Sequence, residues 1–340
     1  MSKGAKIWII AAMLLILTGC IIFGGVMTVL KWDFKNLSTT KFENNKYDIT
    51  EEFSSISIDT DTADIMFVIS ETEQGSVVCY EQKNIRHSVG VKDGGLVIDV
   101  TDTRKWYEHI GINFSTPKIT VYLPEGEYSL LSVRTSTGDL EIPKELKFEN
   151  IEVSDNTGDV TNNASASETV KIKTSTGKIK VEDISAASLD LSVSTGKVTL
   201  SDVKCEGDIK IKVTTGKAFI NDVFCKSLVS DGSTGDISLS NVKIEEKLSI
   251  ERSTGDVRLE DTTAAEFSIE TDTGDVDFIV SDADEIYVET DTGHVKGTLL
   301  SEKIFITQTD TGNISVPESV TGGKCKINTD TGNIEISIIR

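Results

Sequence analysis

Two segments, Thr271-Asp272-Thr273-Gly274-Asp275-Val276 and Thr290-Asp291-Thr292-Gly293-His294-Val295, show most clearly the motif that decides the fold of this chain. In each segment a Thr-Gly step is followed by a polar residue and then by an aliphatic residue. This whole motif occurs eleven times, and successive glycines of the motif are 19 or 20 residues apart. Such a regular period is typical of a solenoid, which grows in one direction by stacking similar units. The glycines are Gly138, Gly158, Gly177, Gly196, Gly216, Gly235, Gly255, Gly274, Gly293, Gly312 and Gly332.

The apolar residues within one repeat predict three short strands. Counted from the glycine, they fall at about +2, +4, +7, +9, +12 and +14. Each pair two residues apart describes a strand with alternating inward side chains, and each jump of three describes a corner. We therefore expect an all-β fold, a single-stranded parallel β-helix with a right-handed coil, the usual hand of parallel crossovers. In the repeat of Gly177 these residues are Ile179, Val181, Ile184, Ala186, Leu189 and Leu191.

The Thr-Gly segment forms the third and widest corner. From +14 to the next +2, seven or eight residues pass without a required inward residue. Glycine supplies the positive φ that a tight corner demands. Because a threonine precedes the glycine in every copy, stacking of the coils predicts a ladder of hydroxyl groups along one edge. The simplest role of this ladder is to form hydrogen bonds with the polar groups of the corner. The threonines are Thr137, Thr157, Thr176, Thr195, Thr215, Thr234, Thr254, Thr273, Thr292, Thr311 and Thr331.

Two positions beside the glycine change in blocks along the repeats. Directly after it come Asp, then Lys, then Asp again, and finally His and Asn. Two residues before it, Ser, Asn or Thr give way to Asp in the last four repeats. Like charges about 4.8 Å apart repel by about 1 kcal/mol in water. The stacked Asp side chains are therefore expected to point away from one another, to accept hydrogen bonds from backbone N–H groups, or to bind a cation. Asx-type capping is the prediction, with calcium as the alternative. The column comprises Asp272, Asp291, Asp310 and Asp330.

The N-terminus predicts a membrane segment. Residues 7–30 carry no charge and lie between the basic residues Lys6 and Lys31, and their 24 residues exceed the length that spans a bilayer core as a helix, about 20 residues. We expect residues 1–31 to be a cytoplasmic leader and a signal-anchor, with the remaining chain outside a bacterial cell membrane. Leu17-Thr18-Gly19-Cys20 also resembles a lipobox with a lipidated Cys20, although the apolar run continues beyond that cysteine.

Three regions are expected after the membrane segment: a polar stalk at 32–50, an atypical N-terminal β region and cap at 51–130, and an eleven-coil solenoid at 131–340. Within the second region, Thr60-Asp61-Thr62-Ala63-Asp64-Ile65 is a damaged copy of the motif and predicts a first coil. Residues 104–114 contain Trp106, Tyr107 and His109. This stretch is expected to cover the open end of the solenoid, with a ligand site as the alternative.

Composition limits the partners. The formal net charge of −21 argues against nucleic acid and against adsorption to anionic lipid. The five cysteines include no Cys-x-x-Cys pair, so a zinc ribbon is not expected. Cys205 and Cys225 both fall at +9, an inward position, and are expected to stack as buried free thiols, and Cys325 is interpreted in the same way.

No catalytic residue, cofactor site or metal site is predicted. Polysaccharide-acting β-helices need clustered carboxylates with basic residues in an aromatic groove, and this chain has no Trp after Trp106 and only Tyr122, Tyr128 and Tyr287 after Phe114. No Gly-x-Ser-x-Gly, His-Glu-x-x-His or Walker motif occurs. We therefore expect a protein that is not an enzyme.

The membrane-proximal strand region, the Lys-Ile-Thr-Val-Tyr-Leu-Pro segment at 118–124 and the serial Thr-Gly-Asp-Val coils resemble a known family. It is the bacterial putative-adhesin family of β-strand-repeat proteins, catalogued as domain of unknown function 4097. The likeness covers about residues 50–340, and no functional residue transfers because the motif is repetitive. The resemblance implies an envelope-anchored β-solenoid, in some members associated with envelope-stress loci.

Two functions remain open. The first is a surface-exposed solenoid that binds a cell-envelope component or a membrane protein partner. The second is a module that assembles with itself, because the chain stops at 334–340 inside a coil that carries no polar cap. An uncapped coil presents unpaired backbone groups, which favours end-to-end pairing and hence a homo-oligomer.

Overall fold

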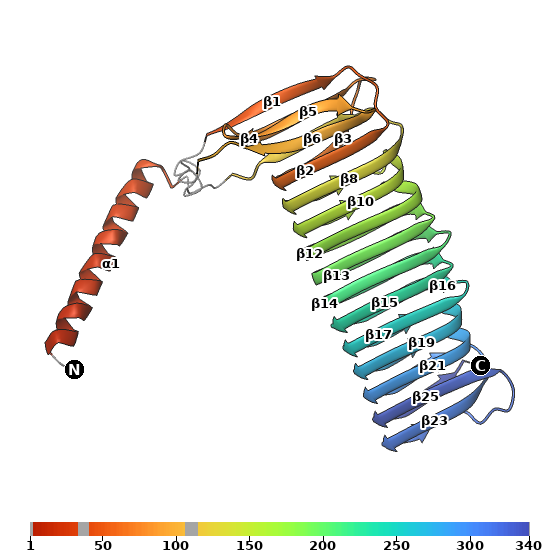
Figure 1. Cartoon of the computed structure of the whole chain (residues 1–340). Helices are drawn as coiled ribbons and strands as arrows, with labels where there is room; N and C mark the ends of the chain where they lie inside the picture. Colours follow the sequence, from red (N-terminus) through yellow and green to blue (C-terminus); the bar gives the residue numbers. More distant parts are fainter. Residues whose placement is uncertain (1–2, 33–40, 106–114, 340) are drawn as a thin grey trace.

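The computed structural model describes residues 3–32, 41–105 and 115–339. One helix, α1 (Lys3–Val29), precedes a 26-stranded sheet that is wound into a β-solenoid (Figure 1). Residues 4–29 of α1 are long and apolar enough to cross a membrane, a property that an N-terminal signal sequence shares. Cys20 is exposed on this helix. The expected fold class is confirmed, while the right-handed coil stays a prediction.

The strands fall into an N-terminal group and a solenoid group. The first comprises β1 (Phe42–Ile49), β2 (Ser55–Thr62), β3 (Asp64–Ile69), β4 (Gly75–Gln82), β5 (Ile85–Lys92), β6 (Gly95–Asp102) and β7 (Lys118–Leu123). The second comprises β8 (Glu127–Thr137), β9 (Leu140–Ile142), β10 (Lys147–Thr157), β11 (Val160–Asn162), β12 (Ser165–Ala186), β13 (Ser188–Cys205), β14 (Asp208–Cys225), β15 (Ser227–Thr234), β16 (Ile237–Ile244), β17 (Lys247–Thr254), β18 (Val257–Glu260), β19 (Thr263–Thr273), β20 (Val276–Ile279), β21 (Asp282–Thr292), β22 (Val295–Leu299), β23 (Lys303–Thr311), β24 (Ile314–Ser315), β25 (Gly323–Thr331) and β26 (Ile334–Ile338).

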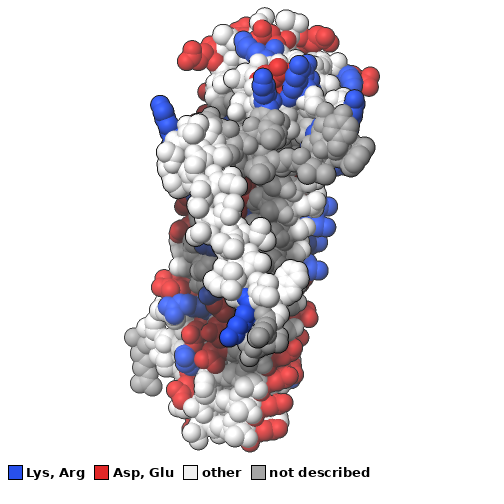
Figure 2. Space-filling view, turned by 90° about the vertical axis from the view of Figure 1, so that its left-hand side faces the viewer, with Lys and Arg blue, Asp and Glu red and all other residues white. Residues whose placement is uncertain are grey.

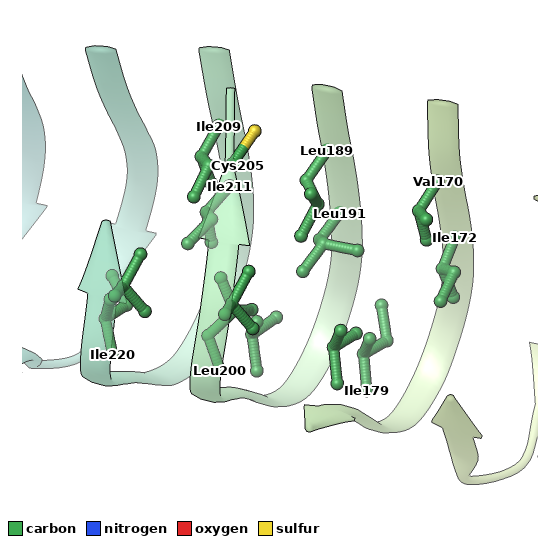
Figure 3. Close-up of a cluster of buried hydrophobic side chains, with 14 of the residues drawn as sticks. Val170, Ile172, Ile179, Leu189, Leu191, Leu200, Cys205, Ile209, Ile211 and Ile220 are labelled. Atoms are coloured by element: carbon green, nitrogen blue, oxygen red, sulfur yellow. The ribbon is translucent and has the colours of Figure 1, made fainter. Parts of the chain in front are cut away.

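Successive coils stack in register, so that equivalent residues form columns. Between β12 and β13, for example, Gly177 pairs with Gly196 in a parallel ladder. The predicted inward residues fill the interior, where apolar side chains of neighbouring coils pack against one another (Figure 3). Each fully buried aliphatic side chain contributes about 1.5–3 kcal/mol, so the repeated columns supply most of the stabilisation. Cys205, Cys225 and Cys325 are buried free thiols, as expected.

The interior contains one column that apolar periodicity did not predict. The residue three before the glycine also points inward, although the corner was expected to have no inward position. The sequence predicted no inward position here because most residues of this column are polar, and an apolar pattern does not include polar residues. Its buried polar members are Thr60, Thr135, Asp155, Thr174, Arg252, Thr271, Thr290 and Thr329.

Arg252 is the largest buried member of this column and places a basic group inside the solenoid. Its Nη2 donates to Ser230 Oγ at 2.7 Å and its Nη1 to the carbonyl oxygen of Val213 at 3.4 Å, while its buried Nε has no partner in the described chain. Gly232 leaves the necessary room, since a Cβ at that position would overlap Nη1. Burial lowers the pKa of the Arg252 guanidinium.

Replacing Arg252 with methionine is therefore expected to stabilise the protein. Methionine keeps an unbranched apolar stem and removes a buried charge that pairs with no carboxylate of the described residues, so the free energy of unfolding should rise by about 1–3 kcal/mol. Chemical denaturation of both proteins measures this difference. A lower free energy of unfolding for Arg252→Met would show that the two hydrogen bonds of Arg252 outweigh its desolvation.

The N-terminal end of the solenoid is closed by strands. The damaged motif forms the first coil, because β2 pairs with β8 and β3 pairs with β9, while the N–H of Ala63 donates to the carbonyl oxygen of Thr137. Beyond this coil, β4 lies between β7 and β1 in an antiparallel arrangement, and β5 pairs with β6. The predicted stalk at 32–50 is therefore wrong for residues 42–49, which form β1. The aromatic residues Trp106, Tyr107 and His109 lie outside the described residues.

The order of the last coils in space differs from their order in the chain. Strand β25 pairs with β21 on one side and β23 on the other, and β26 likewise lies between β22 and β24 (Figure 1). The coil of β23 and β24 therefore ends the solenoid. The prediction that residues 334–340 form the exposed edge of the solenoid is wrong for β26, since Ile336 in this strand is only 5% exposed. The coil at the end has the more polar interior, with Thr307 at the position that Ile327 occupies in β25.

Candidate binding surface

At the Thr-Gly corner, backbone N–H groups are hydrogen-bonded by the side chains of the column directly after the glycine. In the coils that carry Asp at this position, its side chain accepts a hydrogen bond from the backbone N–H of the counterpart in the next coil. The N–H of Asp159 donates to Asp139 Oδ1 at 2.9 Å, that of Asp275 to Asp256 Oδ1 at 2.9 Å, and that of His294 to Asp275 Oδ1 at 2.8 Å. The sequence predicted this capping for the residues two before the glycine, whereas the structure shows it at the residue directly after the glycine. Asp occurs at both positions, so the sequence did not distinguish them.

The acidic column two residues before the glycine is exposed. In space it runs in the order Asp272, Asp291, Asp330 and Asp310, because the coil of β25 lies between the coils of β21 and β23. Within the described chain, none of these four carboxylates makes a hydrogen bond or ion pair. The predicted Asx-type capping by this column is therefore wrong, and calcium binding stays an untested alternative.

The threonines before the glycines stack as predicted. Thr176, Thr195 and Thr215 are direct partners in the parallel ladders of β12, β13 and β14, and all three are exposed. Among the described residues no hydrogen bond joins two hydroxyl groups of this column. The column is therefore an in-register stack of side chains along one edge of the solenoid rather than a bonded hydroxyl ladder.

A second acidic column lines the corner six residues after the glycine. Its residues have φ between 47° and 57°, a left-handed conformation that Asp and Asn tolerate better than most residues. Sequence reasoning placed a corner here but did not notice these side chains, and the repeated Asp or Asn was the available signal. All of them except Asp261 line an open groove with Lys204 and Lys243. The column comprises Asp183, Asp202, Asp222, Asn241 and Asp261.

The most distinctive surface is the outer face of the long strands that lead into the Thr-Gly corner, which we call the long-strand face. Its charge changes sign within one column: Lys212 in β14 is the direct ladder partner of Asp231 in β15. Above this point the face carries a basic patch, and below it an acidic patch. The basic patch comprises Lys171, Lys173, Lys210 and Lys212, and the acidic patch comprises Asp231, Glu251, Glu270 and Glu289.

All eight side chains are exposed, and no ion pair between described residues involves any of them. In Figure 2, lysine side chains project from the right-hand edge at mid-height, and acidic side chains line the same edge below them. Adjacent coils lie about 4.8 Å apart, so the four acidic side chains repeat at this spacing. In the basic patch the spacing is twice as long, because Ser192 lies between Lys173 and Lys212 and Asp190 lies between Lys171 and Lys210. Such an arrangement produces a strong local potential of opposite sign in the two halves.

The lysines directly after the glycines behave differently, because two of them are paired. Lys178 Nζ lies 2.9 Å from Asp159 Oδ2, and Lys217 Nζ lies 2.7 Å from Asp236 Oδ2. Hydrogen bonding to Asp236 raises the pKa of Lys217, and the same bond lowers the pKa of Asp236. These exposed pairs contribute little to stability, but they remove charge from the corner and leave the long-strand face as the unpaired surface.

The buried thiols are not reactive groups. Burial, followed by nearby negative groups, raises the pKa of Cys225 to about 12, and burial raises the pKa of Cys325 to about 12. Thiols with such high pKa values remain protonated near neutral pH and are poor nucleophiles. The fold and this surface define a class, a β-solenoid with one membrane-spanning-type helix and an extended charged face.

Comparison with protein families identifies the chain more narrowly. The Toastrack DUF4097 family matches residues 53–222 and 217–340, and the chain belongs to this family. The resemblance drawn from the Thr-Gly coils is thereby confirmed. No curated protein matches the chain.

The solved structures that the chain matches have low sequence identity to it. A putative adhesin from Parabacteroides merdae is 14% identical, with a TM-score of 0.47 over 76% of this chain and 96% of that chain. A putative lipid binding protein from Parabacteroides distasonis is 13% identical, with a TM-score of 0.33 over 88% of this chain and 98% of that one. A putative cell adhesion protein from Clostridium sporogenes is 11% identical, with a TM-score of 0.23 over 88% of this chain and 100% of that one.

Proposed function

We propose that this chain is a non-enzymatic, membrane-anchored binding module whose solenoid stands outside the cytoplasm. In this proposal α1 remains attached as a signal-anchor, and the long-strand face binds an envelope component or a membrane protein partner. The observation that carries the proposal is the change of charge between Lys212 and Asp231 within a single column of exposed side chains, none of which forms an ion pair with another described residue.

Physical reasoning supports a binding role for this face. The run of four acidic side chains has no basic residue between its members, so their mutual repulsion raises the free energy of the isolated protein, and a partner of complementary charge relieves that repulsion. Because the two patches have opposite sign, they also fix the direction in which an elongated partner lies along the solenoid. Electrostatic complementarity of this kind controls specificity and association rate more than final affinity.

Charge reversal tests the proposal. The full chain, purified in detergent, is incubated with isolated cell wall and with a membrane-protein extract, and the retained components are compared with those retained by Lys173→Glu/Lys212→Glu. The double variant is expected to retain the specific component at least about tenfold less well, which corresponds to about 1.4 kcal/mol. The difference should shrink as salt is added, because exposed charges are screened.

The matched control is Lys83→Glu/Lys144→Glu, which changes the net charge equally in two exposed turns away from this face. It should bind as the unmodified chain does. Equal binding by all three proteins would contradict the role of the long-strand face. Binding lost equally in both double variants would indicate a response to net charge alone.

Self-assembly is the second candidate, now through β23. This strand ends the solenoid and exposes Ile304 and Ile306, which are 42% and 49% exposed on its outer side. Unpaired strand edges with apolar side chains favour pairing with another chain. Light scattering of the full chain against Ile304→Lys/Ile306→Lys tests this candidate, and the same particle mass for both proteins counts against it.

A further inference from the structure

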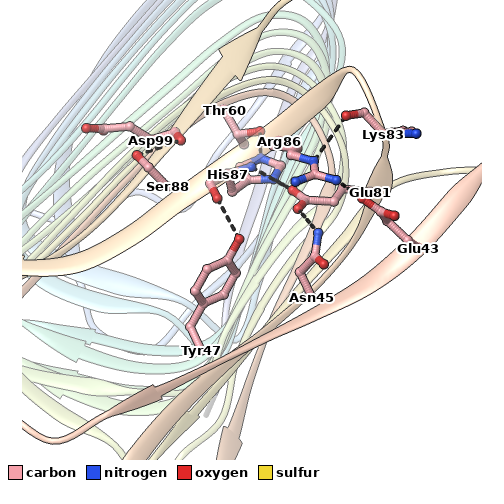
Figure 4. A network of polar contacts seen from close by, with 10 residues as sticks. All are labelled: Glu43, Asn45, Tyr47, Thr60, Glu81, Lys83, Arg86, His87, Ser88 and Asp99. Atoms are coloured by element: carbon pink, nitrogen blue, oxygen red, sulfur yellow. Dashed lines mark hydrogen bonds and ion pairs between the residues drawn. The ribbon is translucent and has the colours of Figure 1, made fainter.

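The N-terminal cap contains a cluster of side chains that the binding function does not use. Cys79 and Glu81 lie two residues apart on β4, so their side chains share one face, and His87 enters from β5 (Figure 4 shows Glu81 and His87). Their exposed fractions are 0%, 1% and 4%. One ligand atom from each residue lies within 4.8 Å of the others.

We propose that Cys79, Glu81 and His87 form a binding site for a zinc-class divalent transition-metal ion. Thiolate sulfur, imidazole nitrogen and carboxylate oxygen are together a typical zinc ligand set, whereas calcium and magnesium prefer oxygen ligands. Ligand atoms of a tetrahedral zinc site lie roughly 3.3–3.8 Å from one another. The cluster therefore needs only small side-chain rotations to reach this geometry.

Surrounding contacts hold two of the three ligands in place. His87 Nε2 lies 2.9 Å from Thr60 Oγ1, and His87 Nδ1 lies 2.7 Å from Glu81 Oε2. Asn45 Nδ2 donates to Glu81 Oε1 at 2.6 Å. A metal that binds Nδ1 and Glu81 would replace their mutual hydrogen bond and leave the contacts of Thr60 and Asn45 intact. Such outer contacts orient metal ligands in known sites.

The thiol also fits a metal site better than an apolar core. Cys79 Sγ has no hydrogen-bond partner in the described part of the chain, although it lies beside two polar side chains. Burial, and after it the Glu81 carboxylate, raise the pKa of Cys79 to about 12, so the thiol is protonated without metal. Binding of the cation would release this proton to solvent and bring the thiolate, the carboxylate and neutral imidazole to the metal.

The position of the cluster gives the metal a structural role. Asn45 belongs to β1, which pairs with β4 over its whole length and is the first strand after α1. Tyr47 of β1 donates its hydroxyl to the carbonyl oxygen of His87 at 3.0 Å (Figure 4). A metal bound at this place would therefore strengthen the attachment of β1 to the cap. This strand is the part of the cap that follows α1 most directly in the chain.

Cobalt titration tests the site in the full chain purified in detergent. Metal is first removed with a chelator under a phosphine reductant, and Co²⁺ is then added without air. One Co²⁺ per chain is expected, with an intense near-ultraviolet band of thiolate-to-cobalt charge transfer that Zn²⁺ removes by displacement. Absence of this band at saturating Co²⁺ in the unmodified chain overturns the proposal.

Two cysteine variants locate the ligand. Cys79→Ser should lose the charge-transfer band, whereas Cys325→Ser should keep it, since Cys325 is an equally buried free thiol in β25. The opposite pattern overturns the assignment. Should Cys79→Ser fail to fold, X-ray absorption of the zinc-loaded unmodified chain decides, because one sulfur and two nitrogen or oxygen ligands are expected. Coordination without sulfur overturns the proposal.

Discussion

Gly216→Ala is expected to destabilise the solenoid by about 3–5 kcal/mol, the combined effect of backbone strain and a steric overlap. Gly216 has φ of 137°, a conformation that side chains rarely adopt, and a Cβ there would overlap the carbonyl oxygen of Gly196 in the neighbouring coil. The overlapping atom belongs to the backbone of Gly196, so the overlap cannot be relieved by rotating a side chain. Chemical denaturation followed by circular dichroism measures the loss.

Gly90→Ala provides the control for this substitution. Gly90 lies in β5, its φ is not positive, and a Cβ there meets no atom within 4 Å. Its free energy of unfolding should stay within about 0.5 kcal/mol of the unmodified chain. A Gly216→Ala protein that is as stable as Gly90→Ala would show that the coils can shift apart at the corner, contrary to the tight stacking described above.

Glu81→Ala is expected to cost about 3–5 kcal/mol, measured in the presence of a chelator so that bound metal does not contribute. The carboxylate of Glu81 accepts hydrogen bonds from Asn45 Nδ2 and from the backbone N–H of His87, and it contacts His87 Nδ1. Alanine leaves these buried groups without an acceptor, and each unsatisfied group costs about 1–3 kcal/mol. The melting temperature should fall accordingly.

Glu43→Ala is the matched control, because Glu43 is the direct ladder partner of Glu81 between β1 and β4. Its carboxylate pairs with Arg86 at the surface, where both side chains are substantially exposed. Exposed ion pairs contribute about 0–1 kcal/mol, so this variant should unfold almost as the unmodified chain does. Similar losses for Glu43→Ala and Glu81→Ala would show that the cap depends on strand pairing rather than on the buried contacts.

Much of the fold could be predicted because a solenoid is locally determined. Each coil contacts only its neighbours, so a regular period and an inward pattern such as Ile179, Val181 and Leu191 suffice to define the stack. The first coil was predictable even with Ala63 in place of glycine, since the surrounding Thr-Asp-Thr and Asp-Ile residues were retained. The stacked positions of Cys205 and Cys225 followed from the same offsets.

Features that depend on which strands meet could not be predicted. The cluster of Cys79, Glu81 and His87 arises from a hairpin outside the repeats, where no period relates one residue to another. The charge change at Lys212 and Asp231 becomes a surface only when the register of β14 and β15 is known. The interior position of β25 could not be predicted because the two coils are similar and differ only at single positions, such as Ile327 against Thr307.

The interleaved coils near the end of the solenoid have a consequence for how the protein folds. Strands β25 and β26 follow β23 and β24 in the chain, yet they separate that coil from β21 and β22. Folding therefore cannot add coils one after another in the order of translation. The coil of β23 must either wait without a neighbour or first dock on β21 and later yield its place. A fusion placed after β26 would accordingly emerge from the side of the rod, one layer below its tip.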